Sequence, residues 1–147
     1  ALGIRVVEGG LHPILASADL AFVASGTATL EAALCGAPMV VVYRTSAVSF
    51  AIGRVLIRIP WISLVNIVAG ERIVPELLQR EVNAEGLERE GETLLSDPAR
   101  LAAMRSGLER VSRALGPPGA TGRAADAVLE AIENGGRPWA LAAESRS

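Results

Sequence analysis

The sequence predicts an α/β fold, in which helices cover both faces of a parallel sheet. Half of the 147 residues are hydrophobic but only 3% are aromatic, so the core must consist mainly of Ala, Val, Leu and Ile. Short apolar runs, which are typical of parallel strands buried on both faces, alternate with segments whose apolar residues recur at helical spacing. Strands that alternate with helices are joined by right-handed crossovers and therefore lie parallel.

The apolar runs are the expected strands. Residues 20–24 and 39–43 are continuously apolar, so we expect both of these strands to be buried on both faces. Residues 3–7 and 61–64 are further short runs that we expect to form strands. Residues 66–70 are expected to form a loop after the last of them.

Helices are expected between and after these strands. The helix at residues 27–35 should end at Gly36, because glycine readily adopts the left-handed conformation that closes a helix. Pro60 should end another helix, and Pro75 should begin one, since proline is tolerated in a first helical turn. The expected helices cover residues 11–18, 27–35, 46–59, 75–79, 84–95, 98–115 and 122–133.

Length and composition limit the organisation of the chain. We expect one domain over residues 1–133 and a flexible tail rich in Gly, Arg and Ser over residues 134–147. The chain begins without Met and close to a strand, so we expect it to be the C-terminal part of a longer protein. A net charge of −2 gives no global field for nucleic acid, and no apolar run reaches the roughly 18 residues of a membrane span.

Reactive side chains are sparse. The single cysteine, Cys35, excludes an internal disulfide and fits a reducing compartment. Cys and His residues do not cluster, so we expect neither a protein metal site nor a cofactor. His12, the single histidine, precedes Pro13 in a turn and is interpreted as structural.

The stretch "ASGTATLE" at residues 24–31 is the main candidate site. Ser25, Gly26 and Thr27 lie between a strand and a helix, where free N–H groups and the helix dipole favour an anion such as phosphate. Glu31 lies about one turn deeper and would repel phosphate, but its carboxylate can accept hydrogen bonds from ribose hydroxyls. The stretch therefore fits a nucleoside diphosphate. The alternative is an ordinary helix start followed by a glutamate on the helix surface.

Other polar residues are candidates for the same site. Arg44 ends a strand and can contact phosphate, or it is a surface arginine. Asn66 can bind a sugar or a base edge, or it only forms a turn. Glu76 and Gln79 share one face of the helix expected at 75–79 and can bind sugar hydroxyls or another domain, or they are simply solvated.

The helix expected at residues 46–59 has a second apolar face. Phe50 and Ile57 lie opposite its core face, and Arg54 and Arg58 flank them. Exposed apolar residues bordered by arginine indicate an interface, which can be a membrane surface or another domain.

Two longer stretches, "ASADLAFVASGTATLEAALCGAPMVVVYR" and "WISLVNIVAGERIVPELLQ", closely resemble the lipid-A-disaccharide synthase family. The resemblance runs from about residue 11 to residue 79 and continues weakly to residue 133. It implies a Rossmann-like fold that forms the C-terminal, UDP-sugar-binding half of a GT-B type glycosyltransferase. It implies an inverting hexosyltransferase reaction, in which diacylglucosamine is transferred from UDP to diacylglucosamine 1-phosphate in lipid A biosynthesis of Gram-negative bacteria.

The resemblance also implies roles for particular residues. The diphosphate falls at Ser25, Gly26 and Thr27, and the ribose at Glu31. Asn66 falls in the Ser-Leu-x-Asn loop of the family, and Glu76 and Gln79 in its Pro-Glu-Leu-Leu-Gln motif. The chain departs from the family pattern at Val65, where proline is expected, and at Glu71, where arginine is expected. Arg72 is the substitute that we consider for position 71.

The resemblance implies that the catalytic residues lie outside this chain. It implies that a missing N-terminal domain binds the acceptor and holds the general base, so this chain alone binds the UDP-diacylglucosamine donor without turnover and holds no catalytic residue. It implies a cytoplasmic location, peripheral on the inner membrane. The alternatives are a UDP-N-acetylglucosamine epimerase-like domain of the same fold and a non-catalytic nucleotide-binding module.

Overall fold

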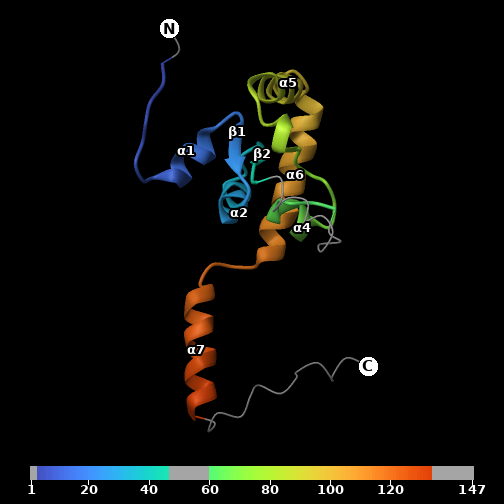
Figure 1. The fold of residues 1–147 in the computed structure, drawn as a ribbon. Coiled ribbons are helices and arrows are strands. Elements are labelled where there is room, and N and C mark those ends of the chain that lie inside the picture. The colour runs from blue at the N-terminus through green and yellow to red at the C-terminus, as the bar shows by residue number, and fades with distance from the viewer. Residues whose placement is uncertain (1–2, 47–59, 134–147) are drawn as a thin grey trace. The chain divides into compact units, whose positions relative to one another are not determined.

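The computed structural model of the chain describes residues 3–46 and 60–133. The chain divides into two compact units, Ala1–Leu115 and Gly116–Ser147. Figure 1 labels the described α-helices and the strands β1 and β2. The elements in chain order are α1 (Leu11–Ser17), β1 (Ala21–Ala24), α2 (Thr27–Leu34), β2 (Met39–Tyr43), α4 (Leu64–Ala69), β3 (Glu76–Leu78), the 3-10 helix η1 (Gln79–Glu81), α5 (Ala84–Leu95), α6 (Pro98–Leu115) and α7 (Ala120–Glu133).

The described part of the first unit contains a three-stranded parallel sheet with the order β1-β2-β3. Val41 of β2 is in register with Val23 of β1 and with Glu76 of β3. Side chains in register on neighbouring strands point to the same face of a sheet, so the carboxylate of Glu76 shares a face with two valines. This arrangement confirms the expected parallel α/β fold.

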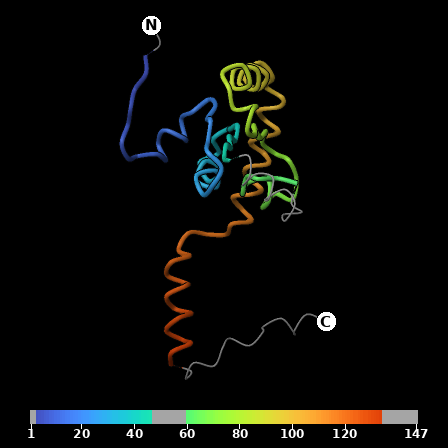
Figure 2. Tube along the Cα trace, in the orientation of Figure 1, coloured from blue at the N-terminus to red at the C-terminus, as the bar shows by residue number. Residues whose placement is uncertain are grey.

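A hydrophobic core joins the sheet to the helices. Helices α2, α4 and α6 pack on one another, and Figure 2 shows α6 running alongside α4. Strand β2 is central and its residues Met39, Val40 and Val41 are completely buried. Methionine packs well in irregular gaps, and the Sδ of Met104 in α6 accepts a hydrogen bond from the N–H of Met39 at 3.3 Å. The core thus fixes α6 across the sheet.

Several elements agree with the sequence prediction. Helices α1, α2, α5 and α6 and strand β2 lie where the apolar pattern placed them. Gly36 follows α2 with a φ of 67°, as expected for a glycine that closes a helix. Helix α7 begins two residues before the expected 122–133. The expected boundary at residue 133 stays a prediction, because residues 134–147 lie outside the described residues, as does the helix expected at 46–59.

The strand expected at residues 3–7 is not formed, and this expectation was wrong. Ile4 and Val6 are 87% and 88% exposed. A strand needs a neighbour for its N–H and C=O groups, and in the described residues β1 pairs only with β2. Edge strand β1 is also less covered than expected, since Phe22 is 48% exposed and was predicted to be buried.

The strand expected at 61–64 is not formed, and α4, which begins at Leu64, takes the place of the loop expected at 66–70. Ser63 caps this helix, because its side chain accepts a hydrogen bond from the N–H of Asn66. Gly70 ends the helix with a φ of 69°. A short apolar run does not by itself distinguish a strand from a buried helix, and here the cap decides for the helix.

The helix expected at 75–79 is instead strand β3 followed by η1. The carbonyl of Pro75 accepts a hydrogen bond from the N–H of Val41 at 2.9 Å. Proline lacks an N–H but can accept, so it fits the residue before a strand as well as the start of a helix. Glu76 and Gln79 therefore do not share a helical face.

Gly86 is a position where the fold requires glycine. It is the third residue of α5, and a Cβ there would lie 2.1 Å from the backbone oxygen of Glu81. We expect Gly86→Ala to lower the free energy of unfolding by about 1–3 kcal/mol, as overpacking does. Gly122 is the matched control, since it is the third residue of α7 and a Cβ there would meet nothing within 4 Å. Urea unfolding followed by circular dichroism measures both variants, and equal stabilities would contradict the packing of α5.

Candidate functional site

The loops that follow the three strands meet at one edge of the sheet. In a parallel sheet the carboxyl ends of the strands lie on the same side, and ligands bind there. Ser25 and Gly26 follow β1, Arg44 and Thr45 follow β2, and Gln79 follows β3. We call this set of loops the carboxyl edge.

The turn between β1 and α2 leaves its N–H groups available. Gly26 has a φ of 150° and a ψ of −163°, which L residues with side chains rarely adopt. Ser25 is fixed by its own N–H, which donates to the carbonyl of Val42 at 3.0 Å. The N–H groups of Gly26, Thr27 and Ala28 have no acceptor within residues 3–46 and 60–133. A Cβ on Gly26 would meet nothing within 4 Å, so the space beside the turn is open.

Glu31 is a partly exposed residue of α2, and it has a partner that the sequence did not indicate. The Nε2 of His12 in α1 lies 3.9 Å from its Oε2, and the two side chains are 68% and 43% exposed. An exposed pair at this distance contributes little to stability. The contact arises because α1 packs on α2. No spacing rule links the two positions, so sequence reasoning could not find it.

Glu76 is at the centre of a polar cluster. Its Oε1 accepts hydrogen bonds from the N–H of Ser63 at 2.9 Å, the hydroxyl of Ser63 at 2.7 Å and the Nδ2 of Asn66 at 2.8 Å. Its Oε2 accepts from the N–H of Ile62 at 3.0 Å. A carboxylate that receives only donors is favoured in its ionised form.

Asn66 is fully buried, and both the oxygen and the nitrogen of its side chain are hydrogen-bonded to protein atoms. Its Oδ1 accepts from the N–H of Ile73 at 2.9 Å and of Val74 at 3.0 Å. Its Nδ2 donates to the carbonyl of Val74 at 3.0 Å and to Glu76. An amide with these partners connects α4 to the segment that leads into β3.

Gln79 holds the loop after β2. Its Oε1 accepts from the N–H of Thr45 at 2.8 Å, and its Nε2 donates to the carbonyl of Thr45 at 3.1 Å. Gln79 has a φ of 52°, unusual for a residue other than glycine. Arg44, which precedes Thr45, is exposed and makes no hydrogen bond or ion pair with the described residues. Its guanidinium is thus available at the carboxyl edge.

A hydrogen bond joins the first loop to the polar cluster. The hydroxyl of Ser25 donates to the carbonyl of Ile62 at 3.2 Å. Ile62 also donates its N–H to Glu76. The turn after β1 and the start of α4 are therefore connected through one residue.

The charge at position 71 is neutralised locally. Glu71, where the sequence resemblance led us to expect arginine, forms an ion pair with Arg110 of α6. Its neighbour Arg72 is exposed. The negative charge of Glu71 is thus paired with a positive charge on α6.

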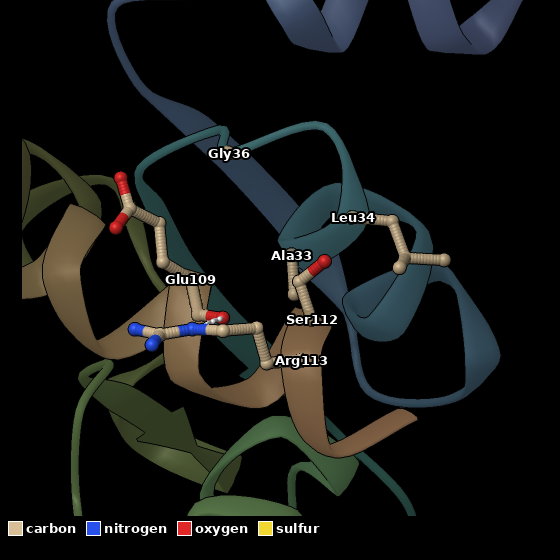
Figure 3. A pocket seen from close by; sticks show the side chains of 6 residues that line it. All are labelled: Ala33, Leu34, Gly36, Glu109, Ser112 and Arg113. Atoms are coloured by element: carbon tan, nitrogen blue, oxygen red, sulfur yellow. Dashed lines mark hydrogen bonds between the residues drawn. The ribbon is translucent and has the colours of Figure 1, made fainter. Parts of the chain in front are cut away.

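A shallow groove of about 330 Å³ lies between the C-terminal end of α2 and α6 (Figure 3). The side chains that line it are those of Ala33, Leu34, Glu109, Ser112 and Arg113, with Gly36 at the end. The Nε of Arg113 donates a hydrogen bond to the carbonyl of Glu109 at 3.3 Å. None of the candidate residues lines this groove, so we place the candidate site at the carboxyl edge.

Two other classes of site find no support in the described residues. No group of three or more His, Cys, Asp or Glu side chains there could hold a metal ion. No described helix combines the length and apolar character needed to cross a membrane.

The structure thus divides the candidate residues into two sets. One set lies on the carboxyl edge or on α2 behind it: Ser25, Gly26, Thr27, Glu31, Arg44 and Gln79. The other set, Asn66 and Glu76, lies in the polar cluster and is bonded to protein atoms. Phe50, Arg54, Ile57 and Arg58 lie outside the described residues.

Comparison with known proteins identifies relatives of the chain. The family described as lipid-A-disaccharide synthetase matches residues 3–129. The lipid-A-disaccharide synthase of Syntrophus aciditrophicus is 45% identical over 131 residues, which are 89% of this chain and 34% of that protein. Those of Anaeromyxobacter dehalogenans and Solibacter usitatus are 47% and 46% identical over 87% and 88% of this chain, and 33% and 34% of those proteins. The chain spans about a third of the length of these curated relatives.

The polar cluster makes the stability of the protein depend on pH. Burial raises the pKa of Glu76, but the hydrogen bonds from Ser63, Ile62 and Asn66 outweigh it and hold this pKa below its ordinary value. A depressed pKa contributes stability above the unfolded value, and that contribution is lost as the pH falls through the folded value. We therefore expect Glu76→Gln to be less stable than the wild type at neutral pH, with the difference shrinking in acid.

Chemical unfolding at several pH values measures this difference. Glu81→Gln is the control, since Glu81 is exposed and accepts one hydrogen bond, from the N–H of Leu78 at 3.1 Å. A stability difference for Glu76→Gln that stays constant down to the lowest pH at which the protein is folded would contradict an ionised Glu76.

Proposed function

The chain belongs to the lipid-A-disaccharide synthetase family, and we propose that it forms the part of such an enzyme that binds the UDP-linked sugar donor. The observation that carries this proposal is the turn after β1, where three N–H groups without a partner among the described residues lie at the start of α2. The positive end of a helix dipole and free N–H groups are suited to a diphosphate.

In this proposal the diphosphate lies against Ser25, Gly26 and Thr27. The exposed guanidinium of Arg44 supplies the positive charge from the neighbouring loop, and arginine can bind phosphate oxygens in a bidentate way. Glu31 accepts hydrogen bonds from the ribose hydroxyls. Together these groups hold a nucleoside diphosphate at the carboxyl edge.

Asn66, Glu76 and Gln79 support the proposed site from within the protein. The side chain of each is already bonded to protein atoms, so each contributes by fixing a loop. Gln79 fixes the loop that contains Arg44, through Thr45. The motifs in which they occur thus serve the geometry of the carboxyl edge.

The proposed reaction is an inverting transfer of diacylglucosamine from UDP to diacylglucosamine 1-phosphate. The bond from the anomeric carbon to UDP breaks while the acceptor oxygen attacks from the opposite side. Negative charge then develops on the leaving diphosphate, where the N–H groups of the turn and Arg44 stabilise it. This reaction requires no metal ion.

In this proposal, residues outside this chain bind the acceptor and supply the general base. The relatives are about three times as long, which supports a second domain in the complete enzyme. The chain alone is therefore expected to bind donor without turnover. Since both substrates are acylated, we extend the proposal to a peripheral position on the cytoplasmic face of the inner membrane.

Calorimetric titration of the chain with UDP, ADP and GDP tests the binding role. The proposal predicts the tightest binding for UDP, and equal affinity for the three nucleotides would contradict it. Disaccharide synthesis restored by adding the N-terminal part of a relative would separate the synthase from a nucleotide-binding module. The family match favours the synthase over an epimerase-like domain.

Gly26 provides the sharpest test of the diphosphate position. We expect Gly26→Ala to strain the backbone by about 1–3 kcal/mol and to place a methyl group in the open space beside the turn. UDP should lose more affinity than UMP, because only UDP needs the close approach. Calorimetry with UDP, UMP and uridine measures the loss, and an equal loss for all three would indicate a general distortion.

Glu31 tests the position of the ribose. We expect Glu31→Ala to weaken UDP binding by about 1–3 kcal/mol, as the loss of hydrogen bonds to a charged group does. The deoxyribose analogue of UDP should lose less in the same variant. His12→Ala is the control, since it removes the partner of Glu31 while leaving the carboxylate. An unchanged affinity of a folded Glu31→Ala variant would remove Glu31 from the site.

A further inference from the structure

The polar cluster reaches the turn after β1 through a single peptide group. The peptide between Ile62 and Ser63 contributes an N–H, from Ser63, and a C=O, from Ile62. That N–H donates to Glu76 at 2.9 Å, and that carbonyl accepts from the hydroxyl of Ser25 at 3.2 Å. One rigid, planar group therefore has the carboxylate on one side and the serine on the other.

The two hydrogen bonds strengthen each other. A negative acceptor at the N–H of a peptide polarises the group and makes its carbonyl a better acceptor. The Oε1 of Glu76 has no acceptor capacity to spare, because the hydroxyl of Ser63 and the Nδ2 of Asn66 donate further hydrogen bonds to it. The carboxylate therefore cannot turn away from the peptide without losing several partners.

The serine end of this link is part of the proposed diphosphate site. The hydroxyl of Ser25 donates to Ile62, and its N–H donates to Val42. Both donors of Ser25, which precedes Gly26, are bonded to protein atoms and fix this residue in place. Ser25 thus anchors the turn whose next N–H groups, those of Gly26 and Thr27, have no acceptor among the described residues.

We infer that Glu76 is a positioning residue for the donor site, acting through the peptide between Ile62 and Ser63 and the hydroxyl of Ser25 to orient the N–H groups of the turn after β1. This inference rests on the proposed function for its consequence, because those N–H groups are the ones that would bind the diphosphate. The link itself exists without a ligand and can be measured separately.

The first experiment records amide resonances of the ligand-free chain by ¹⁵N–¹H correlation NMR. Glu76→Gln should shift the amides of Gly26, Thr27 and Ala28, because the amide NH₂ replaces an acceptor and weakens the hold on the peptide. Ser63→Ala is the matched control: it removes one bond to the same carboxylate and the cap of α4 but leaves the peptide N–H. Its effect on the three turn amides should be much smaller.

The outcomes separate positioning from general packing. Equal shifts of the turn amides in Glu76→Gln and Ser63→Ala would mean that the cluster only stabilises α4, and would overturn the inference. Turn amides unmoved in a folded Glu76→Gln variant would overturn it as well. If Glu76→Gln does not fold, Ser25→Ala tests the link from its other end. The amide of Ser63 should then move, and a stationary Ser63 amide would contradict the link.

The second experiment connects the link to ligand binding. Glu76→Gln should lower the affinity for UDP about tenfold, within the range usual for coupling between sites. In a double-mutant cycle, Ser25→Ala should cost less affinity in the Glu76→Gln background than in the wild type, because both changes break one link. Additive effects would mean that Glu76 acts on UDP independently of Ser25. If the wild type does not bind UDP, the proposed function fails while the NMR result still decides the link.

Discussion

The carboxylate of Glu76 is the group on which the carboxyl edge depends. It joins β3 to the start of α4 by accepting hydrogen bonds from Ile62, Ser63 and Asn66. A half-buried charge is costly unless donors surround it, and here the donors come from α4 and the two residues before it. The same cluster extends through Ile62 to Ser25, so the loop after β1 shares its support. Under our proposal, the nucleotide site at this edge depends on one ionised residue that does not itself touch the nucleotide.

Local patterns predicted the elements whose start and end signals are strong. The helix after β1 begins beyond Gly26 and closes at Gly36, and α6 begins at Pro98, as the sequence indicated. The region from 61 to 79 was predicted wrongly, because short apolar runs fit both strands and helices. There the cap formed by Ser63 and the pairing of Pro75 with β2 decided the outcome. Neither decision can be derived from periodicity.

The candidate site was predictable only where chemistry and local geometry coincide. Ser25, Gly26 and Thr27 between a strand and a helix fit either an anion site or an ordinary helix start, and the structure adds that Gly26 has backbone angles that residues with side chains rarely adopt. The partners of Gln79 and Glu31 are remote in sequence, and those of Asn66 lie seven to ten residues away; all of them arise from packing. Asn66 in particular was expected in a loop, either bound to a sugar or a base edge or only forming a turn, and it is instead completely buried in α4. Motif residues can therefore serve a site by shaping it.

The measurement that tests this account most directly is a crystal structure of the chain with UDP. The account predicts the diphosphate within hydrogen-bond distance of the N–H groups of Gly26 and Thr27, with ribose hydroxyls on the carboxylate of Glu31. It also predicts that Glu76 keeps its bonds to Ile62 and Ser63. UDP bound in the groove between α2 and α6, or UDP contacting Glu76 directly with the polar cluster opened, would contradict the account.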